Sequence, residues 1–355
     1  MSILPVLLLA AAAARAEPPA AAVNRVMHRV DELVGRERGR DAREIDALDR
    51  QAEALFAELK PLGWRAAAPL GEAAGAPARS AKARLFAVTF LSKLRDPAAF
   101  DPLSGVLLDA DQDADVRLSA AQALVALDAP PASSRRAFCA ALAQPELPRL
   151  VEDEVLIALT RLGCDDPAPL LKTARAFGAR PSDADLSTVR RALTALGVSR
   201  GEAAARGLLS LVSWFPPRRP ARAAAIAALA RKREDLATWL QSEAFPVVRD
   251  ALRSETNSPA AMTDLLSVAD AFGPRADALL LPLASHPDPE VLAAAAEALA
   301  RRGDVAALPE LEAAAAGALS DPRFAPKPGR PDPAELLSRL EAAVESLRRT
   351  RAARK

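Results

Sequence analysis

The chain has 355 residues, of which 50% are hydrophobic and 26% are charged, a composition typical of globular proteins. Its 47 basic and 46 acidic side chains leave a formal net charge of +1, which excludes a general binder of nucleic acid unless the arginines gather on one face. Alanine makes up roughly a quarter of the residues, tyrosine is absent and isoleucine is scarce, so the composition predicts an all-α fold.

The first sixteen residues have the pattern of an export signal. An apolar run over residues 3–14 is followed by the small-x-small sequence Ala14-Arg15-Ala16. We therefore predict cleavage after Ala16 and a periplasmic or secreted mature chain. Twelve apolar residues span about 18 Å, less than a bilayer core of about 30 Å, so no transmembrane segment is expected after signal removal. Because no Lys or Arg precedes the run, an uncleaved anchor and a misassigned start remain alternatives.

The residues that flank the central part of the chain have distinct patterns. Two apolar stripes at helical spacing predict a helical hairpin over residues 17–60 that caps the fold. Residues 61–80 are rich in Pro, Gly and Ala and are expected to form a linker. Residues 321–355 are expected to hold a Pro-rich break, then an amphipathic helix with a basic tail.

Residues 81–320 repeat one pattern, an acidic turn followed by an apolar helical run that closes on Ala-Leu or Leu-x-x-Leu. One leucine marks each copy: Leu91, Leu124, Leu159, Leu193, Leu229 and Leu299. The steps are 33, 35, 34, 36 and 70, so a further copy is expected near Leu265, and the register is least certain over residues 234–285. A period near 35 made of two antiparallel helices predicts an α-solenoid of stacked helical hairpins.

The clearest copies are DADVRLSAAQALVALD at residues 113–128 and HPDPEVLAAAAEALARRGD at residues 286–304. These copies resemble the HEAT-repeat superfamily, in particular the short HEAT-like repeats of bacteria, and the resemblance covers about residues 82–320. It implies HEAT-like hairpins whose second helices line a concave surface. It also implies a protein-binding scaffold more often than an enzyme.

Three arginines, Arg84, Arg117 and Arg222, each lie seven residues before the leucine that marks their repeat. The resemblance implies that such an arginine pairs with an aspartate of the neighbouring repeat as a structural ladder. A basic stripe that binds an acidic partner is the alternative, and these three residues are therefore candidate binding residues.

The segment WFPPRRP, residues 214–220, lies between two expected helices. Adjacent aromatic rings beside an arginine pair match the composition of interface hot spots, so Trp214, Phe215, Arg218 and Arg219 are candidate binding residues. The alternative is a helix end that tucks both rings onto the stack, followed by a proline-enforced turn.

Candidate metal and catalytic residues are few. His28 and His286 are the only histidines, and neither has a metal-ligand spacing. HEAT-like enzymes that hydroxylate a protein with iron and paired His-Glu motifs are excluded, because the chain has no His-Glu dipeptide. The alternating aspartates of residues 109–115 lack the Gly and Glu that an EF-hand loop requires, so we expect them to cap a helix rather than to bind calcium. No metal, cofactor or catalytic residue is predicted.

Cys139 and Cys164 are expected in the middle of one helix and just beyond the end of the next. Helical rise then separates them by roughly 13 Å, more than the 7 Å or so that a disulfide allows, so two unpaired, buried thiols are predicted.

These observations together favour an exported, non-enzymatic scaffold or adaptor of the bacterial cell envelope that binds another protein, with no nucleic acid and no small-molecule substrate. The alternatives are an enzyme or enzyme subunit that uses the solenoid as a substrate cradle, and a cytoplasmic scaffold. An enzyme should have a pocket where carboxylates or arginines converge, whereas a scaffold should have a broad groove along which polar residues are spread.

Overall fold

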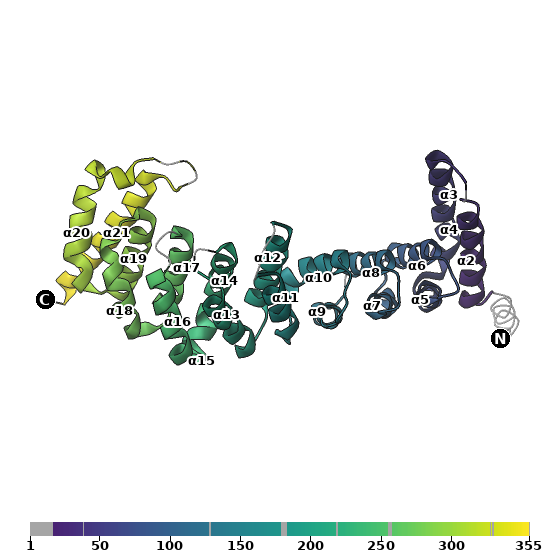
Figure 1. The fold of residues 1–355 in the computed structure, drawn as a ribbon, viewed down its shortest axis with the longest axis horizontal. Coiled ribbons are helices and arrows are strands. Elements are labelled where there is room, and N and C mark those ends of the chain that lie inside the picture. Colours follow the sequence, from purple (N-terminus) through teal and green to yellow (C-terminus); the bar gives the residue numbers. More distant parts are fainter. Residues whose placement is uncertain are drawn as a thin grey trace, which may run out of the picture. The chain divides into compact units, whose positions relative to one another are not determined.

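The computed structural model describes residues 17–354, except residues 38, 128, 179–182, 218, 255–257, 327 and 329. Within this described part every regular element is a helix, as the composition predicted. The chain divides into two compact units, Met1–Ala158 and Leu159–Lys355, and the division falls inside the helix Arg149–Leu162. Figure 1 labels the helices of each unit. The predicted cleavage residues Ala14 and Ala16 lie outside the described residues.

The first unit is a row of helical hairpins. Its elements are α2 (Pro19–Gly35), α3 (Ala42–Ala54), α4 (Phe56–Leu59), η1 (Lys60–Ala66), α5 (Ala67–Gly75), α6 (Ala81–Leu94), η2 (Pro97–Ala99), α7 (Phe100–Leu108), α8 (Ala114–Ala126), α9 (Pro131–Leu142) and the start of α10 (Arg149–Leu162). Helices α6 and α8 pack side by side in one layer, and α5, α7 and α9 follow one another in the second layer. Helix α2 packs against α3 and α4 at the start of the unit.

The structure differs from the expected linker at residues 61–80. These residues hold η1 and α5, and α5 packs along α6 with Leu70, Ala73 and Ala74 buried. A helix forms here without a leucine-rich stripe because alanine is the best helix former and lets neighbouring helices approach closely.

The second unit continues with the same hairpins. Its elements after α10 are α11 (Ala168–Gly178), α12 (Asp183–Val198), α13 (Glu202–Trp214), α14 (Pro220–Ala230), α15 (Arg233–Trp239), α16 (Gln241–Ser254), α17 (Pro259–Asp270), η3 (Gly273–Ala276), α18 (Asp277–Leu280), η4 (Leu281–Ser285), α19 (Pro289–Arg302), η5 (Val305–Ala307), α20 (Leu308–Gly317), η6 (Ala318–Ser320), η7 (Pro322–Phe324) and α21 (Pro333–Ala353). Helices α12, α14, α17, α19 and α21 pack in sequence as one layer. The helices that precede them form the other layer, so the predicted stack of helical hairpins is confirmed within each unit.

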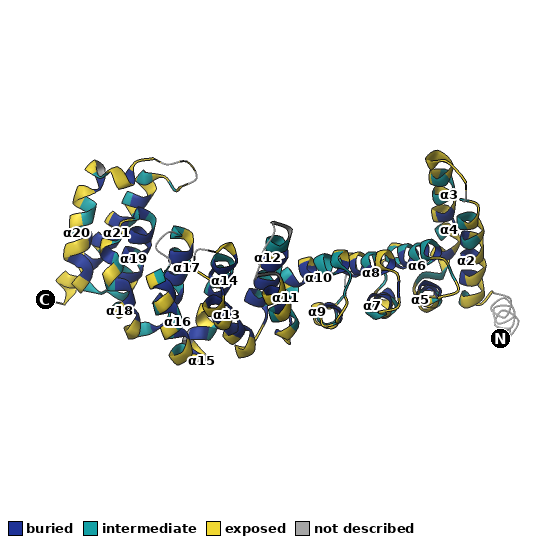
Figure 2. Ribbon diagram, viewed as in Figure 1, coloured by how far each residue is buried: buried dark blue, intermediate teal, exposed yellow. Residues whose placement is uncertain are grey.

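The leucines that mark the repeats lie in the core. Leu91, Leu124, Leu159, Leu193, Leu229 and Leu299 are each at most 1% exposed. Leu265 is fully buried in the middle of α17, which places the missing copy where the period predicted it. Figure 2 shows buried residues along the helices of both units, with exposed residues on their outer faces. Each hairpin therefore buries its apolar face against its neighbours.

Polar side chains join neighbouring hairpins through backbone carbonyls. The acceptor carbonyls lie at or near helix ends, where intrahelical partners run out. The donors and acceptors are Gln112 to Ala74 at 3.1 Å, Gln144 to Leu108 at 2.6 Å, Gln241 to Phe272 at 2.6 Å, and Lys232 to Ser199.

The prediction of two unpaired thiols is wrong. Both Cys139 and Cys164 are disulfide-bonded, and the described residues contain no free cysteine. Helical rise alone would place Cys164 too far from Cys139 for a disulfide. Gly163 instead adopts a left-handed conformation with φ of 66°, so the chain turns immediately before Cys164.

None of the described helices combines the length and the apolar character that crossing a bilayer requires.

Candidate functional site

Two cavities of the second unit share α17 as a wall. Met262 lines an apolar cavity, whereas Thr263, Asp264 and Ser267 line a polar cleft. Each residue of an α-helix is rotated by about 100° from the preceding one, so Thr263, Asp264 and Ser267 point about 100°, 160° and 140° away from Met262 around the axis of α17. The two cavities are therefore separate.

Four charged side chains converge on the polar cleft. Its volume is about 720 Å³, and its walls come from the C-terminal end of α14, the start of α15 and the exposed face of α17. Arg231, Arg233 and Glu234 lie on one side and Asp264 on the other. None of these four side chains has an ion-pair partner within 4 Å among the described residues. The cleft thus presents charges that the fold itself does not neutralise at contact distance.

Asp264 is the most perturbed group of the cleft. Burial raises the pKa of its carboxyl above the ordinary value of 3.8, and the positive charge of Arg231 opposes this rise. A half-buried carboxyl near a guanidinium can accept or donate a proton when a ligand changes its surroundings. Asp264 is therefore the candidate proton-transfer group.

The hydroxyl groups of the cleft are turned back onto their own helix. The Thr263 hydroxyl donates to the Pro259 carbonyl at 2.9 Å, and the Ser267 hydroxyl donates to the Asp264 carbonyl at 2.7 Å. A nucleophilic hydroxyl needs a base as its hydrogen-bond partner, and neither has one in this arrangement. Among the described residues no group of three or more His, Cys, Asp or Glu could hold a metal ion. The chemistry this cleft offers is anion binding and proton transfer.

The aromatic pair that the sequence singled out is split between core and surface. Phe215 is 1% exposed, whereas Trp214 is 46% exposed, and the two rings meet edge-on with centroids 5.1 Å apart. Arg219 is exposed, and Arg218 lies outside the described residues. Phe215 therefore packs onto the helical stack, as the alternative interpretation of this segment expected. Binding through Trp214 and the arginines stays a prediction.

The three arginines at equivalent positions of their repeats have structural contacts. Arg117 is 1% exposed; its Nε donates to the Leu107 carbonyl at 3.1 Å and its guanidinium also bonds Gln144. Arg222 is 7% exposed and donates to Ser254 at 3.1 Å, while Arg84 is half-buried. Arg117 thus bonds a carbonyl and an amide oxygen of the stack. For Arg84 and Arg222 the pairing with an aspartate of the neighbouring repeat stays a prediction.

The remaining candidate ligands of the sequence have ordinary surroundings. His28 is an exposed residue 3.5 Å from Glu32 on the same helix. Two of the alternating aspartates, Asp109 and Asp113, each accept a hydrogen bond from the backbone N–H two residues later, at 3.1 and 3.0 Å. Asp113 is the N-cap of α8, the role that the sequence predicted, whereas Asp109 follows the last residue of α7 and closes a local turn.

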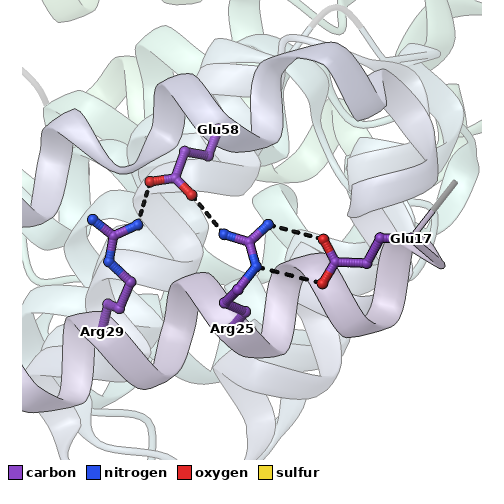
Figure 3. A network of polar contacts seen from close by, with 4 residues as sticks. All are labelled: Glu17, Arg25, Arg29 and Glu58. Atoms are coloured by element: carbon purple, nitrogen blue, oxygen red, sulfur yellow. Dashed lines mark hydrogen bonds and ion pairs between the residues drawn. The ribbon is translucent and has the colours of Figure 1, made fainter.

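A charge network at the start of the first unit is internally balanced (Figure 3). Arg25 donates to Glu17 at 2.9 Å and to Glu58 at 2.7 Å, and Arg29 also bonds Glu58. Hydrogen bonds from Arg25 hold the pKa values of both glutamates below their ordinary value. Because two guanidiniums face two carboxylates, the network ties α2 to α4 and leaves no net charge for a ligand.

Sequence reasoning missed the polar cleft, although a signal for it existed. Arg231 comes two residues after the marker Leu229, and Asp264 comes one residue before Leu265. Both positions project from the layer that the resemblance placed on the concave surface. The sequence did not predict that Arg231 and Asp264 lie close together, because the repeat register is least certain over residues 234–285.

No family model and no curated protein matches the chain. The solved structure of human deoxyhypusine hydroxylase in complex with glycerol is similar to it, with a TM-score of 0.30 and 19% identity over 80% of this chain and 96% of that one. This neighbour is an enzyme, which stands against the prediction of a non-enzymatic adaptor, and that prediction is not carried further. Neither the reaction nor the residues of the neighbour transfer to this chain at such similarity.

Proposed function

We propose that the chain is an enzyme or enzyme subunit, built of HEAT-like repeats, whose second unit cradles an anionic substrate in the cleft between α14 and α17. The observation that carries the proposal is the convergence of Arg231, Arg233, Glu234 and Asp264 on one cavity of about 720 Å³. Convergent charges in a concave site distinguish a substrate pocket from a groove with dispersed polar residues. This proposal replaces the expectation that no small-molecule substrate binds.

The guanidiniums of Arg231 and Arg233 supply the binding energy for the anion. A guanidinium matches the planar geometry of carboxylate and phosphate groups and can donate two parallel hydrogen bonds. Glu234 at the same cleft disfavours ligands of high negative charge and favours those that also carry a donor group. The substrate class is therefore a small acid, a carboxylate or a phosphate ester, with an additional hydroxyl or amine.

Asp264 is the proton-transfer group in this proposal. An anion bound beside the guanidiniums weakens the effect of Arg231 on the carboxyl, which favours the protonated form. The protonated carboxyl then donates to the bound substrate and can serve as a general acid.

Binding is tested by thermal shift with inorganic phosphate, succinate and malate at constant ionic strength. We expect these anions to raise the Tm of the wild-type chain, and the shift to disappear in the Arg231→Gln, Arg233→Gln double variant. The matched control is Arg136→Gln, an exposed arginine of α9 in the other unit. Equal shifts in all three proteins would refute the site.

Catalysis is tested by incubating the purified chain with a metabolite extract and comparing wild type with Asp264→Asn by mass spectrometry. We expect at least one acidic metabolite to be consumed only by the wild type. If anions bind at the cleft but no metabolite differs between the two proteins, the chain binds its ligand without transforming it and the enzymatic part of the proposal is wrong.

We also infer that the chain works in an oxidising compartment. Two observations support this: the export-signal pattern of residues 1–16, and the disulfide bonding of both cysteines, which reducing cytosols disfavour. Mass spectrometry of native protein under non-reducing alkylation tests it. A chain that begins at Glu17 with both cysteines protected is expected, whereas an intact Met1 with two alkylated thiols would contradict the inference.

A further inference from the structure

The second cavity that α17 borders has an identifiable origin in the sequence. Residues 273–285 form three short pieces, η3, α18 and η4, each at most five residues long, in place of one continuous helix. Gly273 has φ of 62°, Pro274 follows it, and Pro282 interrupts the run again, so a continuous helix cannot form. Short pieces in place of one helix leave space beside α16, and the cavity of about 490 Å³ occupies that space.

The walls of this cavity are apolar. Leu252, Met262 and Leu279 line it from α16, α17 and α18, and each is at most 7% exposed. Phe245 and Leu283 complete the wall and are half-buried. The volume lies in the range of small-molecule sites, about 300–1,000 Å³, and exceeds what packing defects leave in a core.

The polar residues at the cavity are all cations or hydrogen-bond donors. Arg249 and Arg253 lie one turn apart on α16, and His286 lies opposite them after η4. Arg249 donates to Asp250 at 2.9 Å, so part of its charge is neutralised. Arg253 is exposed and has no carboxylate within 4 Å among the residues that the structure describes. The Asp288 N–H donates to His286 Nδ1 at 3.1 Å, which leaves Nε2 as the N–H donor of the neutral ring.

From these observations we infer that the cavity between α16, α17 and α18 binds a medium-chain acyl carboxylate, with the chain against the leucines and the carboxylate at Arg253. An apolar body fits the wall, and a single anionic head matches the exposed guanidinium of Arg253, which has no carboxylate partner among the described residues. A cationic or neutral amphiphile would leave that charge unpaired. This site is independent of the proposed polar cleft, because different faces of α17 line the two.

The test uses decanoate as the probe and the full chain, with binding measured by calorimetry. Decanol offers the same chain without the charge, and acetate offers the head group without the chain. We expect decanoate to bind at least tenfold more tightly than decanol, and acetate not to bind. Equal affinity for decanoate and decanol would overturn the role of Arg253, and binding of acetate alone would overturn the role of the apolar wall.

Two variants separate the site from non-specific binding. Arg253→Gln should weaken decanoate binding about tenfold, the loss of one charge-assisted contact, and leave decanol unchanged. Ala278→Trp fills the cavity from an exposed position of α18 and should abolish binding of both amphiphiles while the protein stays folded. The control Arg136→Gln should bind like the wild type. Unchanged binding in Arg253→Gln and Ala278→Trp would refute the inference. The cleft variant Arg231→Gln should bind decanoate like the wild type. This variant therefore distinguishes failure of the apolar site from failure of the proposed function.

Discussion

Replacing Arg117 with methionine tests whether this arginine is a structural residue or part of a basic binding stripe. The guanidinium is 1% exposed and bonds the Leu107 carbonyl and Gln144. A hydrogen bond from a charged donor contributes about 1.5–3 kcal/mol, so two bonds contribute roughly 3–6 kcal/mol. Burial lowers the pKa of Arg117, which shows that the site disfavours the charge, and methionine removes that cost while it fills most of the volume. The net loss of stability should be about 2 kcal/mol.

The assay is urea unfolding followed by far-UV circular dichroism, with Arg136→Met as the control on the exposed face of α9. A loss of about 2 kcal/mol with a slope of about 1–3 kcal/mol per molar lowers the midpoint of the first transition by roughly 1 M. Amide exchange should also become faster at the end of α7, where the Leu107 carbonyl loses its partner. If Arg117→Met unfolds at the same urea concentration as the control, the guanidinium is not a structural donor. The alternative of a basic stripe that binds an acidic partner would then be favoured.

Three further outcomes follow from the structure. Gly163→Ala should destabilise the chain by about 1–3 kcal/mol, because alanine is strained at φ of 66° and its Cβ would lie 2.7 Å from the backbone of the neighbouring hairpin. The control Gly35→Ala, with open space around the new Cβ, should leave thermal unfolding unchanged. Phe215→Ala should cost about 3–5 kcal/mol in urea unfolding and Trp214→Ala under 1 kcal/mol; equal losses would show that both rings are packed. Burial raises the pKa of Asp264 above 3.8 in the folded state, so near and above that pH the folded state binds more protons than the unfolded state. The free energy of unfolding of the wild type should therefore fall relative to that of Asp264→Asn as the pH rises from below 3.8. Parallel pH profiles of the two proteins would contradict a raised pKa.

The sequence predicts the architecture well because the repeat is a property of local pattern. The period of the leucines places Leu265 in α17 without any marker phrase of its own, since each hairpin must keep its apolar face in register with the next. Helix α5 escaped prediction for the opposite reason. An alanine-rich helix buries small side chains, so its stripe is too weak to distinguish from a loop.

The candidate sites were harder to predict because each depends on side chains from separate hairpins. Arg231 and Asp264 are 33 positions apart and meet only once the stack forms. The apolar cavity arises because Gly273 and Pro282 interrupt a helix. Hydrophobic periodicity predicts where helices form, and it does not predict the space that an interrupted helix leaves. The disulfide was missed because a single left-handed glycine redirects the chain, which rise per residue does not describe.

The polar joints between hairpins reach main-chain carbonyls, as at Gln112, Gln144 and Gln241, instead of the side chains of the neighbour. A carbonyl is present whatever residue occupies the acceptor position, so the receiving hairpin can change its sequence freely as long as its backbone path is kept. Hairpins of this chain should therefore be exchangeable as cassettes, each carrying its own glutamine or lysine, and arrays of altered length could be assembled without redesigning the residues on the receiving side of each joint.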